Sequence, residues 1–163
     1  MKIVWLLRHA KSSWENDWLP DHDRPLAPRG YKAGKRLCRF VSENGVRPEL
    51  VLCSTALRAR STLELVLPGL GAPRTELDPS IYLASRDTLL LRLRSLEPAT
   101  SCAMLVGHNP GLHELACLLA PPGPEAVPTG ALAELRLEID DWRSAAPGCA
   151  TLDRLVLPRE LER

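Results

Sequence analysis

The sequence predicts an α/β fold built on a mixed, mostly parallel sheet. Three short and mainly apolar runs, at residues 3–7, 49–53 and 102–106, each end abruptly at polar residues. Runs of this kind are typical of strands buried on both faces of a sheet. A later segment, residues 131–139, alternates apolar and polar residues, which indicates a strand with one solvated face.

The composition is that of one globular domain. The 163 residues are 45% hydrophobic and 25% charged, with a formal net charge of +1, so no broad positive field would attract nucleic acid or an anionic membrane. No apolar run approaches the roughly 20 residues of a membrane span. We expect a single domain over residues 1–157, a charged and frayed tail at residues 158–163, and neither a nucleic-acid nor a membrane partner.

The cysteines indicate the compartment. Cys38, Cys53, Cys102, Cys117 and Cys149 form no CxxC pair and no spacing typical of a zinc site. An odd and scattered set of thiols favours a reducing environment. The strand-like N-terminus lacks the small-residue cleavage site of a signal peptide. We therefore expect a cytoplasmic protein.

The first predicted strand ends at Arg8 and His9. Ligands of α/β sheets bind beyond the carboxyl ends of the strands, so this pair lies where a functional site is expected. Residues 14–28 follow with three prolines and no periodicity, and we predict a loop. His22 in this loop has no second cluster of metal ligands to complete a site, and Arg24 is interpreted as a rim or structural residue, as is Arg29 after it.

Residues 29–44 are predicted to form a helix. Their apolar residues recur at helical spacing, Pro28 suits the first turn, and Gly45 suits the C-terminal end. The lysines and arginines lie mostly on the other face, which we interpret as solvated because the stacking aromatics of a nucleic-acid site are missing.

The second strand leads into a helix that Ser54 or Thr55 is expected to cap. Apolar residues then continue at helical spacing to residue 67, which places Arg58 in the first turn. An arginine there can bind an anion that the helix N-terminus already attracts. From the residues alone, Arg60 is the better candidate for this role, unless both are simply exposed helix arginines.

The later elements follow from similar signals. Residues 68–79 form a connection rich in Gly and Pro that includes a short strand near residues 75–77. Ser85 is the expected cap of a Leu-rich helix over residues 87–96. A weaker last strand is predicted at residues 151–157.

His108 repeats the placement of His9. It comes directly after the third buried strand, and Asn109 is the expected N-cap of the next helix, with Pro110 as its first residue. The strand ends therefore present Arg8, His9, Arg58 and His108 together. Groups that can all be cationic need an anionic partner if they are to lie close together.

A tetrahedral phosphoryl group suits such a set. Guanidinium forks match its oxygens, and a neutral imidazole held at one nitrogen can attack phosphorus with the other. The arginines and the second histidine would stabilise charge on the equatorial oxygens in the transition state. The sequence offers no carboxylate cluster for a metal, so we expect neither a metal nor a cofactor.

Four stretches, LLRHAKSSW, DRPLAPRG, STALRARST and VGHNPGL, resemble the histidine phosphatase superfamily in its short SixA-like phosphohistidine phosphatase branch. The similarity extends over residues 2–137. It implies a three-layer αβα sandwich with a central, mostly parallel mixed sheet, as in the phosphoglycerate mutases. It also implies that His9 is the nucleophile that becomes phosphorylated, and that Arg8, Arg58 and His108 bind the phosphate. On this resemblance Arg58, and not Arg60, is the phosphate ligand.

The chain departs from the family pattern at Thr55 and Ser61, where Pro and Gln are frequent, and we expect effects on packing only. Many family members also supply an acid that protonates the leaving group. Glu76, Asp78 and Asp87 lie in the corresponding region, but none stands in a recognisable motif. An imidazole leaves more readily than an alkoxide, so a phosphohistidine substrate would tolerate a missing acid better than a sugar phosphate would.

These observations predict a metal-independent phosphatase for a phosphohistidine side chain on a signalling protein, such as one of the histidine phosphotransfer type. The connections at residues 68–84 and 120–130 are too short for a large lid, and an open pocket suits a side chain on a protein surface. The first alternative is a general phosphomonoesterase for small phosphate esters, which would need an acid. The second is a non-catalytic phosphate-binding module.

Overall fold

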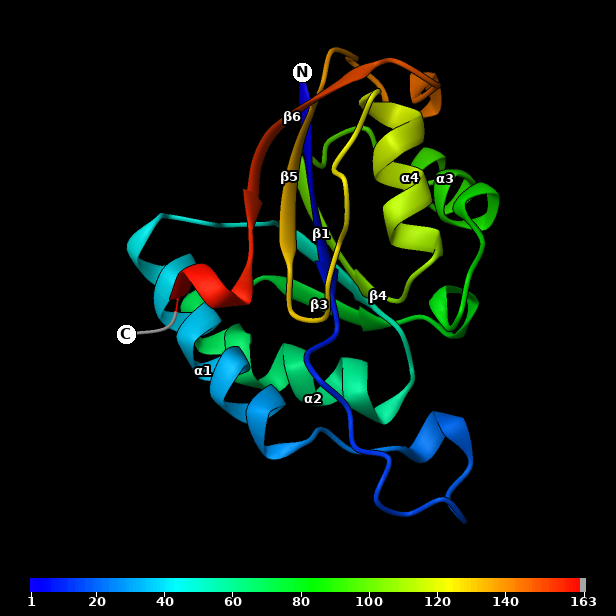
Figure 1. Cartoon of the computed structure of the whole chain (residues 1–163). Helices are drawn as coiled ribbons and strands as arrows, with labels where there is room; N and C mark the ends of the chain where they lie inside the picture. The colour runs from blue at the N-terminus through cyan, green and yellow to red at the C-terminus, as the bar shows by residue number, and fades with distance from the viewer. Residues whose placement is uncertain (162–163) are drawn as a thin grey trace.

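The computed structural model describes residues 1–161, which form a six-stranded sheet with helices on both faces (Figure 1). The strands are β1 (Lys2–Arg8), β2 (Leu50–Cys53), β3 (Arg74–Leu77), β4 (Cys102–Gly107), β5 (Leu132–Leu137) and β6 (Ala150–Val156). The helices are α1 (Pro28–Glu43), α2 (Leu57–Val66), α3 (Arg86–Arg94) and α4 (Gly111–Leu119). Short 3₁₀ turns are η1 (Asp21–Asp23), η2 (Leu67–Gly69), η3 (Pro79–Ile81), η4 (Trp142–Ser144) and η5 (Pro158–Leu161).

The strand order is β3-β2-β4-β1-β5-β6. Strands β3, β2, β4 and β1 are parallel to one another, whereas β5 is antiparallel to β1 and β6 is antiparallel to β5. The predicted mixed and mostly parallel sheet is therefore confirmed. Because β1, β2 and β4 are parallel, their carboxyl ends lie at one edge of the sheet, where α/β proteins bind their ligands.

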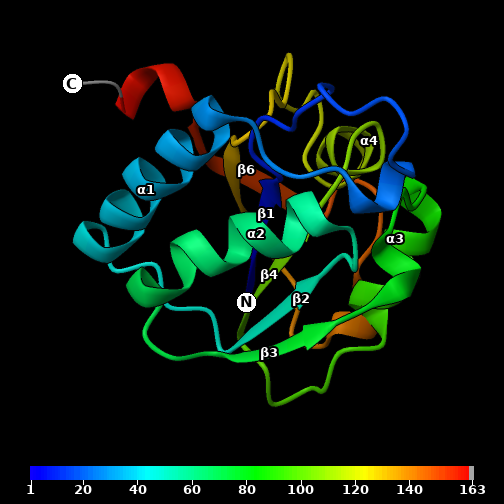
Figure 2. The ribbon, with the colours of Figure 1, turned by 90° about the horizontal axis from the view of Figure 1, so that it is seen from below.

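Helices cover the sheet in two layers, with α1 and α2 on one face and α3 and α4 on the other (Figure 1, Figure 2). The first pair packs on the sheet through buried residues such as Leu37 and Leu63. The second pair uses residues such as Leu93 and Leu115. Each fully buried leucine contributes roughly 1.5–3 kcal/mol, so both layers are held by apolar packing, as the three-layer prediction requires.

The first turn of α1 lies directly against the segment that follows β1. A Cβ atom at Gly30 would lie 2.2 Å from the carbonyl oxygen of Lys11, and the backbone N–H of Ala27 donates to that same oxygen at 2.9 Å. A side chain would not fit between them, so Gly30 lets the helix touch the chain two residues after His9. At the other end, Gly45 has a φ of 65°, as expected after a helix C-cap.

The start of α2 differs from the prediction. Neither Ser54 nor Thr55 caps the helix: the N-cap residue is Ala56, and it provides no side-chain hydrogen bond. Ser54 Oγ instead accepts a hydrogen bond from the backbone N–H of Ala56 (3.2 Å) and contacts His108. The hydroxyl is therefore bound to a residue of another strand end, which no local pattern reveals.

The start of α4 also differs. The sequence predicts Asn109 as the N-cap and Pro110 as the first helical residue, but Pro110 is the N-cap and the helix begins at Gly111. Asn109 still bonds the first turn, since its Oδ1 accepts from the backbone N–H of His113 (3.2 Å). Its amide Nδ2 donates to the carbonyl of Val127 (2.8 Å), which ties the residue to the loop before β5.

The predicted frayed tail is wrong as far as Leu161. Residues 158–161 form the turn η5, which contacts α1. Leu161 is partly buried against the apolar cluster beneath α1 and α2, and this burial explains why the charged segment does not fray there. The last two residues of the predicted tail, 162–163, lie outside the described residues.

Candidate active site

His9 directly follows β1 and is only 6% exposed. Its backbone N–H donates to the carbonyl of Gly107 in β4 (3.1 Å), which fixes it at the carboxyl edge of the sheet. Its Nδ1 lies 2.8 Å from the carbonyl oxygen of Ala10. A carbonyl can only accept, so Nδ1 carries the proton and Nε2 keeps its lone pair. The ring is thus held as the tautomer whose Nε2 can act as a nucleophile.

His108 follows β4 and lies beside His9, with 5.3 Å between the ring centroids. Its Nε2 is 2.7 Å from the hydroxyl of Ser54, and its Nδ1 is 3.5 Å from Nη2 of Arg58. Because a guanidinium group only donates, the lone pair is assigned to Nδ1, and Nε2–H donates to the hydroxyl. The Nδ1 lone pair of His108 therefore lies on the side of the ring where Arg58 is found.

Arg58 is buried in the first turn of α2. Its Nη1 donates to the backbone carbonyl of Asp21 (2.8 Å), and its Nη2 donates to Oδ2 of the same residue (3.0 Å). The phenol of Tyr82 donates to Oδ2 at 2.5 Å, and Nε of Arg24 donates to Oδ1 at 3.1 Å. One aspartate from the loop after β1 thus orients two buried arginines and a tyrosine.

Asp21 is ionised at neutral pH. Partial burial raises the pKa of its carboxyl group, but hydrogen bonds from Tyr82, Arg58 and Arg24 outweigh burial and lower this pKa to about 2. Burial and the hydrogen bond to Asp21 raise the pKa of Tyr82, so the phenol keeps its proton. Asp21 therefore balances positive charge beside the site and holds no proton for a leaving group.

Arg8 is the last residue of β1. Its Nη1 donates to the carbonyl of Val127 (3.1 Å), and its buried Nε has no partner. Within residues 1–161 it forms no ion pair with a carboxylate. Burial and the nearby charge of Arg58 lower the pKa of Arg8. The two guanidinium groups repel one another, and an anion between them would relieve that repulsion.

Both imidazoles are neutral at physiological pH. Burial lowers the pKa of His9 to about 4, and the charges of Arg58 and Arg8 act in the same direction. Burial lowers the pKa of His108 to about 3, helped by His9 and Arg58. A neutral ring is the form that has a lone pair for attack on an electrophile.

Thr62 in α2 links the two strand ends. Its buried hydroxyl accepts a hydrogen bond from the backbone N–H of Ala10 (2.9 Å) and donates to the carbonyl of Arg58 (2.7 Å). The same residue, Ala10, holds the ring of His9 through its carbonyl, which belongs to the next peptide group along the chain. Thr62 therefore positions His9 indirectly, by fixing the peptide between His9 and Ala10 and so the backbone of the residue whose carbonyl holds Nδ1.

The structure brings together the four residues that the sequence places at the site, namely Arg8, His9, Arg58 and His108. Arg60, which the residues alone favour, is not among them, because its Nε donates to the carbonyl at position 55 (3.0 Å). The resemblance to the histidine phosphatases therefore selects the arginine that lies at the carboxyl edge.

The three candidate acids have other partners. Asp78 accepts from Nε of Arg92 at 2.6 Å, and Glu76 lies 3.3 Å from Nη2 of the same arginine. Asp87 is exposed and lies 3.6 Å from Nε of Arg86. None of the three forms a hydrogen bond or an ion pair with the two histidines and two arginines of the site.

Sequence reasoning missed Asp21 and Tyr82. The loop 14–28 has no periodic pattern, and Asp21 reaches an arginine 37 positions further along the chain. The one available signal was its place just before the DRPLAPRG stretch that carries the resemblance.

Among the described residues, no group of three or more His, Cys, Asp or Glu could hold a metal ion, so His22 is no part of such a site. No helix within residues 1–161 is long and apolar enough to cross a membrane.

Fold and site define an α/β protein with two neutral histidines and two arginines at the carboxyl edge of its sheet. The sequence profile of the histidine phosphatase superfamily (branch 1) matches residues 4–81. An uncharacterized protein of Mycobacterium tuberculosis is 35% identical over 163 residues, which covers 94% of this chain and 100% of the relative. The chain belongs to the histidine phosphatase superfamily.

Solved structures agree with this assignment. The protein histidine phosphatase SixA complexed with tungstate matches with a TM-score of 0.84 at 25% identity, covering 98% of this chain and 99% of that chain. A SixA structure from Agrobacterium tumefaciens matches with a TM-score of 0.84 at 26% identity, covering 96% and 98%. The superfamily and these structural neighbours are phosphatases, and the predicted SixA-like fold is confirmed.

Proposed function

We propose that this protein is a phosphohistidine phosphatase that acts on a signalling protein through a covalent intermediate at His9. The observation that carries the proposal is the hydrogen bond from Nδ1 of His9 to the carbonyl of Ala10 (2.8 Å). It leaves Nε2 as the unprotonated nitrogen of a neutral ring that lies beside His108 and within the influence of the charges of Arg58 and Arg8. The similarity to SixA supports the choice of substrate.

In the first step, the lone pair of His9 Nε2 attacks phosphorus, and the P–N bond to the substrate imidazole breaks. Arg8 and Arg58 would bind the equatorial oxygens, and His108 would hydrogen-bond to them once the bound dianion lets it take up a proton. In the second step, water attacks the phosphorylated His9, the new P–N bond breaks, and inorganic phosphate leaves. His9 then returns to its neutral form.

The ionised Asp21 supports a substrate with a good leaving group. No carboxylate that contacts the pocket residues within residues 1–161 holds a proton at neutral pH. A phosphohistidine needs little help, because its imidazole takes a proton from solvent and leaves as a neutral ring. An alkyl phosphate ester would leave as an alkoxide and would react slowly in such a site.

The test compares two classes of substrate. The purified protein is incubated with a histidine-phosphorylated phosphotransfer protein and with a panel of alkyl phosphate esters, while released phosphate and acid-labile phosphate on the enzyme are measured. We expect hydrolysis of the phosphohistidine, slow turnover of the esters, and no activity in His9→Ala. His113→Ala is the matched control, since this histidine bonds the carbonyl of Pro124 (2.8 Å) away from the pocket.

Three outcomes contradict the proposal. Comparable turnover of the esters would favour the general phosphomonoesterase, and turnover in His9→Ala would refute the nucleophile. Phosphate binding without any release would favour the non-catalytic module. We further propose that the reaction needs no metal, so a chelator should leave the rate unchanged.

We also propose that residues 1–157 act as a single catalytic domain in the cytoplasm. All five cysteines are free thiols, which supports a reducing compartment. Fractionation of cells that express the tagged protein tests this location, and recovery in an oxidising compartment would contradict it.

A further inference from the structure

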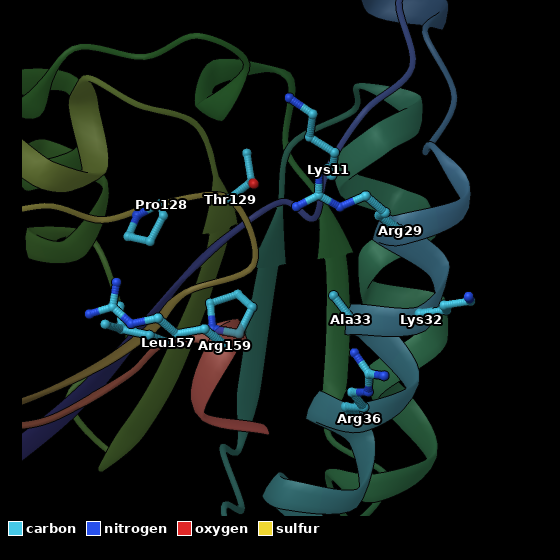
Figure 3. Close-up of a pocket in the computed structure, with 10 residues that line it drawn as sticks. Lys11, Arg29, Lys32, Ala33, Arg36, Pro128, Thr129, Leu157 and Arg159 are labelled. Carbon is cyan, nitrogen blue, oxygen red and sulfur yellow. The ribbon is translucent and has the colours of Figure 1, made fainter. Parts of the chain in front are cut away.

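A positively charged groove lies between α1 and the segment that follows β6 (Figure 3). It has a volume of about 280 Å³. Five basic residues from three parts of the chain line it: Lys11, Arg29, Lys32, Arg36 and Arg159. The formal net charge of the whole chain is only +1, so this concentration of positive charge is local.

No carboxylate side chain of the described residues lines the groove, and Glu160 beside it accepts a hydrogen bond from the backbone N–H of Leu157 (2.9 Å) and pairs with none of the five basic residues. Within residues 1–161, none of the five basic side chains forms an ion pair with a carboxylate. Like charges gathered on one surface repel each other and attract anionic ligands. The groove therefore has the charge of a binding surface for an acidic partner.

The groove begins beside the candidate active site. Lys11 is two residues after His9 in the sequence, and Thr129 on the opposite wall precedes a glycine, Gly130. The backbone N–H of that glycine lies 2.9 Å from the carbonyl of His9 and 3.0 Å from that of Arg8. The groove therefore adjoins the chain segment that carries Arg8 and His9.

The shape of the groove favours an extended ligand. Arg29 reaches toward Lys11 at one end, and Arg36 lines the groove further along α1, whereas the ammonium group of Lys32 points away from the groove and the guanidinium group of Arg159 points away from α1 (Figure 3). Seven helix positions separate the two arginines, which corresponds to roughly 10 Å along the axis. A single small ion cannot touch both ends, but a short acidic stretch of polypeptide can.

We propose that this groove binds an acidic segment of the phosphoprotein whose phosphohistidine enters the pocket, an inference that rests on the proposed function. Carboxylates of the segment would pair with Arg29 and Arg36, and Lys11 would bind the part nearest the pocket. The apolar atoms of Ala33 and Leu157 in the lining would contact its aliphatic parts. The groove would then select acidic substrate proteins and increase their rate of association.

The test uses a fluorescein-labelled deca-glutamate peptide and fluorescence anisotropy. We expect the unaltered protein to bind it in a salt-dependent manner, and Arg29→Glu/Arg36→Glu to weaken binding about tenfold or more. The matched control, Lys35→Glu/Arg39→Glu, makes the same change of charge on the same helix outside the groove and should stay within about twofold. Arg29→Gln/Arg36→Gln, which adds no negative charge, should show an intermediate loss. Thermal unfolding of every variant checks that it folds.

Other outcomes overturn the inference. If Arg29→Glu/Arg36→Glu and Lys35→Glu/Arg39→Glu weaken binding equally, the affinity for the peptide depends only on the net charge of the protein and not on the groove. If inorganic pyrophosphate displaces the peptide at much lower concentration than unlabelled polyglutamate does, the groove is a site for small oxyanions. If the peptide does not bind while phosphohistidine hydrolysis persists, the inference fails and the proposed function stands. If the peptide binds but phosphohistidine is not hydrolysed, the proposed function fails.

Hydrolysis of phosphoramidate, a substrate too small to reach the groove, should be unchanged in Arg29→Glu/Arg36→Glu.

Discussion

Asp21 and Arg58 form a two-point contact, through the backbone carbonyl (2.8 Å) and the carboxylate (3.0 Å) of the aspartate. The contact joins the loop after β1 to the first turn of α2. The contact engages Nη1 and Nη2 of the guanidinium group, and Nη2 also lies 3.5 Å from Nδ1 of His108. The orientation of the arginine within the pocket therefore depends on a loop residue.

Replacing Asp21 by Asn should lower kcat/KM about tenfold or more, because a charge-assisted hydrogen bond that contributes roughly 1.5–3 kcal/mol is lost. The lost charge also leaves Arg58 without its carboxylate partner. Steady-state kinetics with a phosphohistidine substrate measures the effect. Asp23→Asn, in the same short turn but exposed, is the control. Equal effects of the two changes would contradict a specific role for Asp21.

The sequence predicts the residues at the strand ends better than it predicts the residues that support them from other segments. His9 and His108 each follow a continuous apolar run, and such runs need only local information to be recognised as buried strands. Asp21, Ser54 and Thr62 reach the site through contacts between segments 37, 54 and 52 positions apart. Contacts over such distances leave no periodic pattern, so a single sequence cannot reveal them.

Helix boundaries show the same limit. The sequence predicts Ser85 as the cap of α3, and its hydroxyl accepts a hydrogen bond from the backbone N–H of Thr88 (3.2 Å), since no tertiary partner competes for it. Ser54 and Asn109 have equally good capping chemistry, but other strands and loops engage their side chains. At the start of α2 the contact of Ser54 with His108 replaces the predicted cap, whereas at the start of α4 Asn109 serves both the first turn and the loop before β5.

Replacing Ser54 by Ala should lower kcat while leaving the fold intact. The change removes the acceptor of the Nε2–H of His108 (2.7 Å) and leaves that buried N–H unpaired, at a cost of about 1–3 kcal/mol. The ring can then rotate or change tautomer. Kinetics and thermal unfolding measure the two effects, and Thr55→Ala, whose hydroxyl bonds His22 (2.8 Å), is the control. An unchanged kcat would contradict the assignment.

Replacing Thr62 by Val should lower kcat more than it changes KM. The isosteric change removes the acceptor of the Ala10 N–H (2.9 Å), so the backbone of the residue whose carbonyl holds the His9 ring loses an anchor. It also removes the hydroxyl that donates to the backbone carbonyl of Arg58 (2.7 Å), but the guanidinium group of Arg58 keeps its contacts with Asp21. A stability loss of about 1–3 kcal/mol accompanies it. Thr62→Ser keeps the hydroxyl and should restore kcat. A loss of stability with unaltered kcat would show that the residue is only structural.

The pKa values of His9 and His108 predict how the free enzyme responds to acid. With pKa values of about 4 and about 3, both rings stay neutral as the pH falls through 6.5, so kcat/KM should decline only near pH 4. In the imidazole NMR spectrum neither ring should titrate between pH 8 and 5. Tungstate in the pocket should raise both pKa values, because an anion stabilises the imidazolium form.

The same pKa shift predicts a change in stability with a definite sign. Between pH 6.5 and about 4, an unfolded chain binds a proton at His9 that the folded chain does not, so the free energy of unfolding falls as the pH is lowered across this window. A shift of this size corresponds to roughly 3 kcal/mol. His9→Gln cannot take up this proton in either state, and its stability should therefore depend less on pH across the window. Chemical unfolding of both proteins at several pH values measures the difference. Parallel curves would show that His9 titrates normally in the folded protein and that burial does not keep it neutral.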